Sequence, residues 1–63
     1  MKFTKSNGTY KATRKDGQVI TISKSDTGQW VSRYDNDDNG DNTFYADTKK
    51  ELVNDENDLE ARI

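Results

Sequence analysis

The sequence contains no cysteine and no histidine. Without cysteine the chain has neither a disulfide framework nor a thiolate metal site, and its redox compartment is left unconstrained. Without histidine or cysteine, the Ser-His-Asp and Cys-His arrangements of nucleophilic catalysis cannot be built. There is no proline and no glycine-rich phosphate loop. These absences predict a protein that is not an enzyme and that needs no cofactor, with calcium as the one alternative.

Large apolar residues are scarce. Leu, Ile, Val and Phe together number ten in 63 residues, so the six aromatic residues must supply much of any core. A chain of this length buries only about 60% of the surface that its unfolded form exposes. No apolar run approaches the length of a membrane span, and the first residues lack the apolar centre of a secretory signal. We therefore expect one small domain over residues 1–63, cytoplasmic and without a membrane partner.

The triplet Lys15-Asp16-Gly17 separates two segments of alternating polarity, which is typical of a β-hairpin. A three-residue loop places Ala12 opposite Ile20 and Tyr10 opposite Ile22, so the apolar residues share one face. A two-residue loop would put the isoleucines on the face opposite Tyr10. The three-residue loop also sets glycine where a positive φ is needed. The sequence therefore predicts a hairpin closed by residues 15–17.

The triplet Asp26-Thr27-Gly28 predicts a second hairpin by the same argument. It pairs Lys24 with Trp30 and Ile20 with Tyr34. A four-residue loop is the competing register, and it would turn Val31 inward and Trp30 outward. In the favoured register, the inner face of a three-stranded meander carries Tyr10, Ala12, Ile20, Ile22, Trp30 and Tyr34. The outer face carries Thr9, Lys11, Thr13, Val19, Thr21, Ser23, Val31 and Arg33.

The C-terminal third predicts a helix from about residue 48 to residue 61. Thr48 and Glu51 form a capping box at its start. The segment 54–58 contains weak helix formers, so a break into two short helices is an alternative. The apolar stripe of this helix is sparse and comprises Leu52, Val53, Leu59 and Ile63.

The remaining segments are short. Residues 1–7 form a lead-in, either extended or a short strand, with Phe3 over one end of the core. Residues 43–46 form either a short fourth strand or an extended approach to the helix, with Phe44 inward. The predicted fold class is α+β: a three-stranded antiparallel β-meander, with a fourth short strand as an option, packed against one C-terminal helix.

Charge is divided unevenly along the chain. Residues 1–34 carry seven Lys or Arg and two Asp, whereas residues 35–63 carry three Lys or Arg and ten Asp or Glu. The outer face of the meander is rich in threonine and basic residues, and such a sheet can enter a duplex groove. The candidate nucleic-acid site comprises Lys11, Thr13, Lys15, Thr21 and Arg33.

A three-stranded meander followed by a helix that begins Thr48-Lys49-Lys50-Glu51 resembles the small N-terminal arm-binding domains of tyrosine recombinases from mobile elements. In that family the sheet docks in DNA, so the resemblance implies DNA binding through the same face. The overall charge of −2 departs from the basic composition usual for DNA-binding domains.

The acidic segment after residue 34 resembles the first half of an EF-hand calcium loop, with glycine at the sixth position. The departure is at the twelfth position, where Ala46 replaces the bidentate glutamate. The resemblance implies weak calcium binding at a candidate metal site that comprises Asp35, Asp37, Asn39 and Asp41, the last through its backbone carbonyl.

The acidic half of the chain also offers a negative surface to a basic protein partner. The candidate protein-binding residues are Glu51, Asp55, Glu56 and Asp58. We expect a non-catalytic binding or inhibitory module that engages a protein, of the accessory kind seen in phages and mobile elements. The expected state is a monomer or a weak homodimer, since the outer strands of the sheet leave unpaired edges.

Overall fold

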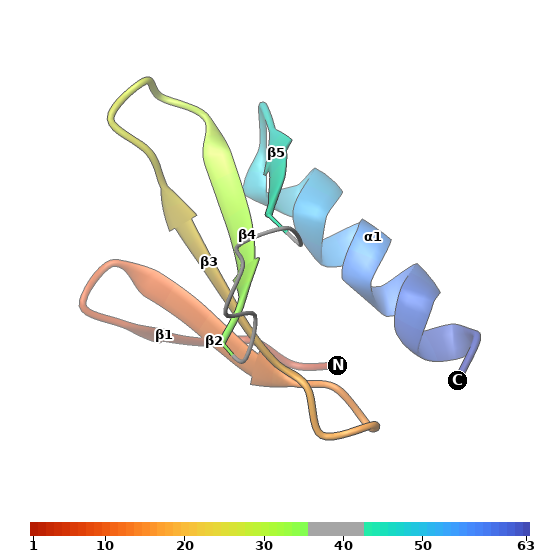
Figure 1. Cartoon of the computed structure of the whole chain (residues 1–63). Helices are drawn as coiled ribbons and strands as arrows, with labels where there is room; N and C mark the ends of the chain where they lie inside the picture. Colours follow the sequence, from red (N-terminus) through yellow and green to blue (C-terminus); the bar gives the residue numbers. More distant parts are fainter. Residues whose placement is uncertain (36–42) are drawn as a thin grey trace.

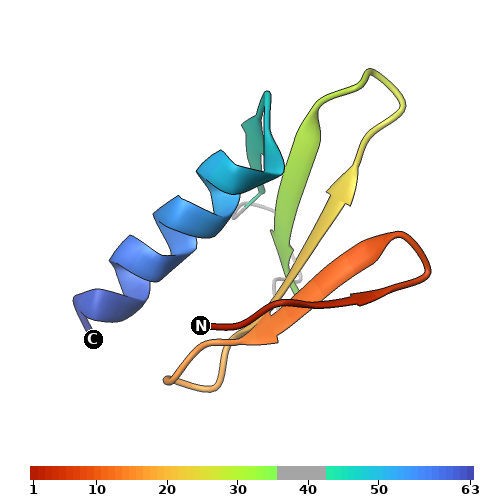
Figure 2. The same cartoon turned by 180° about the vertical axis from the view of Figure 1, so that it is seen from behind.

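A computed structural model of the chain describes residues 1–35 and 43–63. Within these residues, five strands form one antiparallel sheet and a single helix lies against one face of it (Figures 1 and 2). The sheet order follows the sequence, β1-β2-β3-β4-β5. The elements are β1 (Thr4–Ser6), β2 (Thr9–Thr13), β3 (Val19–Lys24), β4 (Trp30–Tyr34), β5 (Phe44–Ala46) and α1 (Lys49–Ala61). The α+β class and the antiparallel sheet are confirmed, but three strands was too few.

The register of the central meander is the predicted one. Ala12 pairs with Ile20 across β2 and β3, and Lys24 pairs with Trp30 across β3 and β4. Gly17 and Gly28 have φ angles of 92° and 90°, a conformation that side-chain-bearing residues rarely adopt. Both triplets are therefore three-residue loops, and the four-residue alternative for the second loop is wrong.

The two additional strands lie at the edges of the sheet. Asn7 and Gly8 both have positive φ, 52° and 82°, so β1 and β2 form a hairpin with a two-residue turn. At the other edge, β5 pairs with β4 and sets Phe44 opposite Ser32. The lead-in and residues 43–46 each supply a three-residue strand, in line with the options given for those segments.

Helix α1 is continuous, without the break at residues 54–58. Thr48 caps it as expected, because its hydroxyl accepts a hydrogen bond from the Glu51 backbone N–H at 3.3 Å. Leu52 is buried and packs with Ile20 and Ile22. Leu59 and Ile63, the other end of the predicted apolar stripe, stay exposed at 38% and 54%.

The core is small. Ile20, Ile22 and Leu52 form its centre, and partly buried side chains surround them. Those surrounding residues are Met1, Phe3, Tyr10, Trp30, Tyr34, Ala46 and Val53. Val31 lies on the outer face, yet it is only 2% exposed, whereas Lys11, Thr13 and Arg33 on the same face are exposed. In the described part of the chain, no helix is long and apolar enough to cross a membrane.

Candidate functional site

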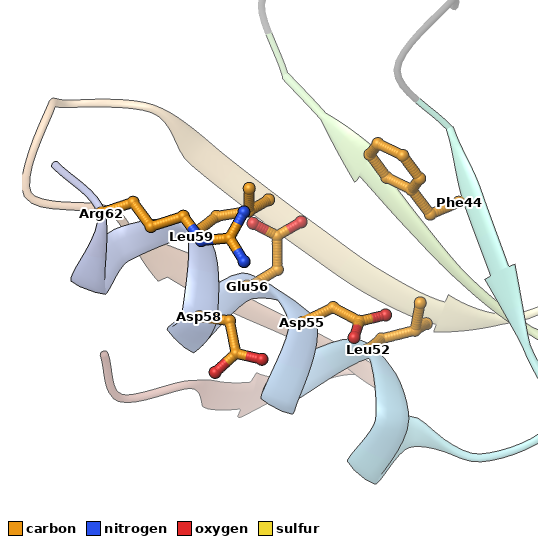
Figure 3. A pocket seen from close by; sticks show the side chains of 7 residues that line it. All are labelled: Phe44, Leu52, Asp55, Glu56, Asp58, Leu59 and Arg62. Carbon is orange, nitrogen blue, oxygen red and sulfur yellow. The ribbon is translucent and has the colours of Figure 1, made fainter.

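A groove of about 290 Å³ lies between α1 and β5. Figure 3 shows Phe44 reaching from β5 toward side chains that line the helix from Leu52 to Arg62. The full lining is Phe44, Leu52, Asp55, Glu56, Asp58, Leu59 and Arg62.

The groove is bordered by exposed apolar side chains. Phe44 is 44% exposed and Leu59 is 38% exposed, while Leu52 is buried beneath them. The large exposed apolar residues of the described chain all belong to β5 or to the C-terminal end of the helix: Phe44, Tyr45, Leu59 and Ile63. Phe44 and Leu59 line the groove, whereas Tyr45 lies on the outer face opposite Val31 and Ile63 follows the end of the helix. Two exposed apolar side chains around one groove are typical of an interaction surface.

The rim of the groove is acidic. Asp55 and Asp58 are exposed on α1 and line the groove, and Arg62 at the helix end is the one basic residue in the lining. An apolar floor with a negative rim can accept an apolar side chain flanked by positive charge.

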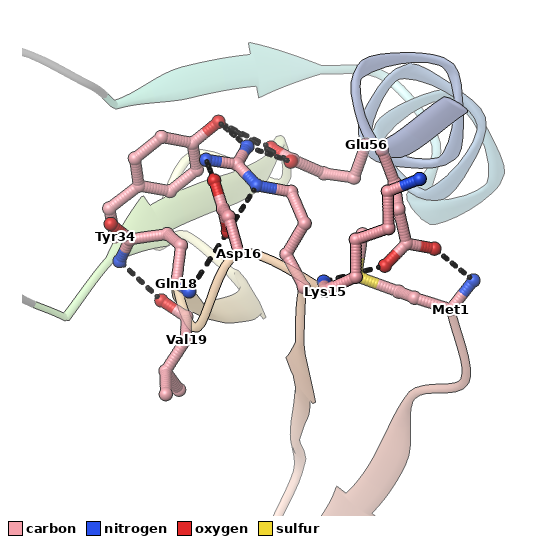
Figure 4. A network of polar contacts seen from close by, with 9 residues as sticks. Met1, Lys15, Asp16, Gln18, Val19, Tyr34 and Glu56 are labelled. Atoms are coloured by element: carbon pink, nitrogen blue, oxygen red, sulfur yellow. Dashed lines mark hydrogen bonds and ion pairs between the residues drawn. The ribbon is translucent and has the colours of Figure 1, made fainter. Parts of the chain in front are cut away.

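Glu56 is buried below the groove at 2% exposure. Tyr34 donates its hydroxyl proton to the carboxylate, with oxygen–oxygen distances of 3.2 and 3.3 Å, and Arg14 Nη1 lies 3.6 Å from Glu56 Oε2 (Figure 4). Burial raises the pKa of Glu56 above its ordinary value, and these two partners only partly offset that effect. Arg14 also pairs with Asp16 at 3.0 Å, and this contact lowers the pKa of Asp16 and raises the pKa of Arg14.

The C-terminal half of α1 is tied to the sheet by polar contacts. The Met1 ammonium lies 3.1 Å from Glu60 Oε1 and donates to Asn57 Oδ1 at 2.7 Å. The Lys15 backbone N–H donates to Glu60 Oε2 at 2.9 Å (Figure 4). These contacts join the C-terminal half of α1 to the first residue of the chain and to the turn between β2 and β3.

The fold brings together only some of the five residues of the predicted nucleic-acid site. Lys11, Thr21 and Arg33 lie in one row across β2, β3 and β4. Thr13 shares the outer face, while Lys15 lies in the hairpin turn beside α1.

An acidic residue that follows β4 contacts two members of that outer row, Thr21 and Lys11. Asp35 accepts a hydrogen bond from the Thr21 hydroxyl at 2.9 Å and pairs with Lys11 at 3.8 Å. The negative charge of Asp35 thus offsets part of the positive charge on which the DNA-binding expectation rested.

The predicted calcium site cannot be placed as a whole. Asp37, Asn39 and Asp41 lie outside the described residues, and Asp35 contacts Thr21 and Lys11. Residues 1–35 and 43–63 contain no cluster of three or more carboxylate, histidine or cysteine ligands.

The predicted acidic surface is corrected at one residue. Glu51, Asp55 and Asp58 are exposed as expected, but Glu56 is buried, and its carboxylate faces Tyr34 and Arg14. The helix is rotated so that Glu56, one turn after Leu52, faces the sheet. Glu56 therefore cannot present its charge to a partner in the folded chain.

The sequence analysis missed the apolar part of the site. Leu59 follows Leu52 by seven residues, which places both on one side of the helix. Because of that spacing, the sequence predicts Leu59 as a core residue. No local pattern shows that β5 has only three residues or that Leu59 stays exposed.

No protein-family model matches this sequence, and neither curated proteins nor solved structures give a significant match.

Proposed function

We propose that this protein is a non-catalytic binding module that engages a partner protein through the groove between α1 and β5. The observation that carries the proposal is the gathering of Phe44 and Leu59 around a groove in a chain that has few apolar residues. Apolar side chains that stay in water contribute little to folding, and a partner that covers them gains the free energy of burying them.

The charge of the rim defines the partner. Asp55 and Asp58 flank the apolar floor, so the complementary ligand is a segment with apolar anchors flanked by lysine or arginine. An amphipathic basic helix has this chemistry and fits a groove beside a helix. While the module is bound to such a basic segment, the segment cannot bind other anionic ligands. The module would act as an inhibitor in this way.

The test uses a synthetic amphipathic helix with a leucine face and a lysine face, titrated into isotope-labelled protein. We expect amide shifts centred on Leu52, Asp55 and Leu59. Leu59→Glu should weaken binding about tenfold or more, since loss of one central apolar anchor commonly costs over 1 kcal/mol. Binding should also weaken as salt rises.

Tyr45→Glu is the matched control. Tyr45 is also exposed and apolar, but it pairs with Val31 on the outer face and does not line the groove. Affinity should stay within about twofold of that of the unchanged protein. Shifts that spread over the outer face, or equal losses in both variants, would refute the groove as the site.

A further inference from the structure

A second cluster lies at the other end of the inner face, around two aromatic side chains. The rings of Tyr10 and Trp30 lie 6.2 Å apart, tilted by 59°, and both are partly exposed. Lys49 Nζ lies 4.0 Å from the centre of the Tyr10 ring, and Lys5 Nζ lies 5.8 Å from it. Lys24 Nζ lies 6.0 Å from the Trp30 ring. We name these five residues the aromatic–lysine cluster.

The register of the sheet builds this cluster from several elements. Lys5 pairs with Tyr10 across β1 and β2, and Lys24 pairs with Trp30 across β3 and β4, so all four share the inner face. Lys49 is the first residue of α1. The groove begins at Leu52, three positions after Lys49, and its far end at Leu59 lies about 15 Å from Lys49 along the helix axis.

The positive charge of the cluster is not neutralised by ion pairs. The ion pairs found in the described chain involve Met1, Lys11 and Arg14, and none uses a lysine of the cluster. The start of α1 adds a partial positive charge, although Asp47 and Glu51 lie close by in sequence. Three ammonium groups therefore surround two aromatic rings, which favours an anionic ligand that also carries aromatic groups.

We propose that the aromatic–lysine cluster binds single-stranded nucleic acid. Unpaired bases stack on aromatic side chains while lysines contact the phosphates, and this mode tolerates any sequence. A duplex keeps its bases stacked on one another and offers mainly phosphates, so it gains less from Tyr10 and Trp30. This site is distinct from the groove, whose acidic rim would repel a phosphate backbone, and the proposal does not depend on the groove having a partner.

Trp30 provides a direct readout because it is the only tryptophan in the chain. Titration with an oligothymidine should quench its fluorescence, since a base that approaches the cluster contacts the indole. With three lysines on phosphates, log K should fall with log salt at a slope of about −2. Unchanged fluorescence together with an absence of amide shifts at Tyr10 and Lys24 would overturn the proposal.

Matched lysine variants localise the site. Lys24→Gln and Lys49→Gln should each weaken oligothymidine binding about threefold to tenfold and reduce the salt slope by about 0.7. Lys11→Gln and Lys15→Gln remove the same charge outside the cluster and should leave affinity nearly unchanged. Equal losses in all four variants would show that charge alone drives binding and would overturn the site.

Two further ligands test the chemistry. A duplex of the same length should bind several-fold more weakly than the single strand, and inorganic polyphosphate should bind without quenching Trp30. Equal affinity for all three would make the cluster a general polyanion surface and refute the nucleic-acid assignment. Tyr10→Leu keeps the charge and removes one ring. It should weaken the binding of the single strand and leave the binding of polyphosphate unchanged.

Discussion

Glu56 brings charge and burial into conflict at a single residue. Its side chain is nearly inaccessible to water, and its partners are one tyrosine hydroxyl and one guanidinium that is shared with Asp16. Desolvation disfavours the charged carboxylate more than Tyr34 and Arg14 favour it, so the folded pKa is raised. Ser32 adds a second buried polar side chain on this face; its hydroxyl makes no hydrogen bond of good geometry in the described part of the chain, yet it lies near enough to Glu56 to lower the pKa of that carboxyl in part. Ser32 and Glu56 are thus the buried polar and charged side chains of this small interior.

The pH dependence of Glu56→Gln follows from this raised pKa. Protonated Glu56 favours the folded state, and that contribution is complete below the ordinary pKa of 4.5 and is lost as the pH rises through the folded value. Glutamine does not ionise. The stability of the variant relative to the unchanged protein should therefore increase from about pH 4 to about pH 7. Urea unfolding followed by circular dichroism at several pH values measures this difference.

Asp16 and Glu60 act in the opposite direction, because contacts with Arg14 and with the Met1 ammonium lower their pKa values. Both residues are present in the two proteins, so their contributions cancel in the comparison. A difference that stays constant or falls as the pH rises would show that ionised Glu56 is well accommodated.

At the scale of the element, α1 depends on its ends and on one anchor. Its middle contains asparagine and aspartate, which are weak helix formers, and the described chain shows Leu52 and Glu56 as its only buried residues. The described last turn has no basic residue to complement the helix dipole. The Thr48 cap accepts a hydrogen bond from a backbone N–H at the start of the helix, while Asn57 and Glu60 bind Met1 and the Lys15 N–H near its end.

Thr48→Ala should lower the free energy of unfolding by about 1 kcal/mol, because it removes the acceptor for the Glu51 N–H. Thr48→Ser retains a hydroxyl and should stay close to the unchanged protein. Thermal unfolding measured by circular dichroism compares the two. If alanine and serine are equivalent, the hydrogen bond at 3.3 Å contributes nothing measurable.

The whole molecule is a sheet and a helix joined by a small apolar contact. Leu52 is the helical member of the central core, with Ile20 and Ile22 as its partners from β3. The rest of the interface between the layers uses partly buried aromatic residues and the polar contacts of Arg14 and Glu60. Stability of the folded chain is therefore concentrated in few residues.

Leu52→Ala should cost about 2–4 kcal/mol, which is a large part of the stability expected for a domain of this size. Trp30 fluorescence and helical circular dichroism should be lost at much lower urea than in the unchanged protein. Leu59→Ala removes the same atoms from an exposed position and should change stability by less than about 1 kcal/mol. Equal losses in the two variants would place the core elsewhere.

The elements differ in how far their residues alone predict them. Alternation around Ile20 and Ile22, together with glycine at positions 17 and 28, was enough to predict both hairpin registers. The hairpin between β1 and β2 also has a local turn signal, the Asn7-Gly8 dipeptide. Its first strand, β1, has only three residues and is too short to show alternation. Residues 43–46 could be assigned as a strand only once β4 was available as a partner, because a three-residue strand has no stable conformation alone.

The sequence by itself determined the meander, the capped helix and the separation of basic and acidic halves, since turn geometry, side-chain alternation and helix capping act over a few neighbouring residues. The tertiary structure alone decided the rotation of α1, and with it the burial of Glu56, the groove beside Leu59 and the position of Lys49 over Tyr10. Those outcomes depend on how a sparse apolar stripe packs against the sheet, where one leucine fixes the helix and a charged residue fills the next inward position. Contacts between residues distant in sequence have no periodic pattern that a local reading could detect.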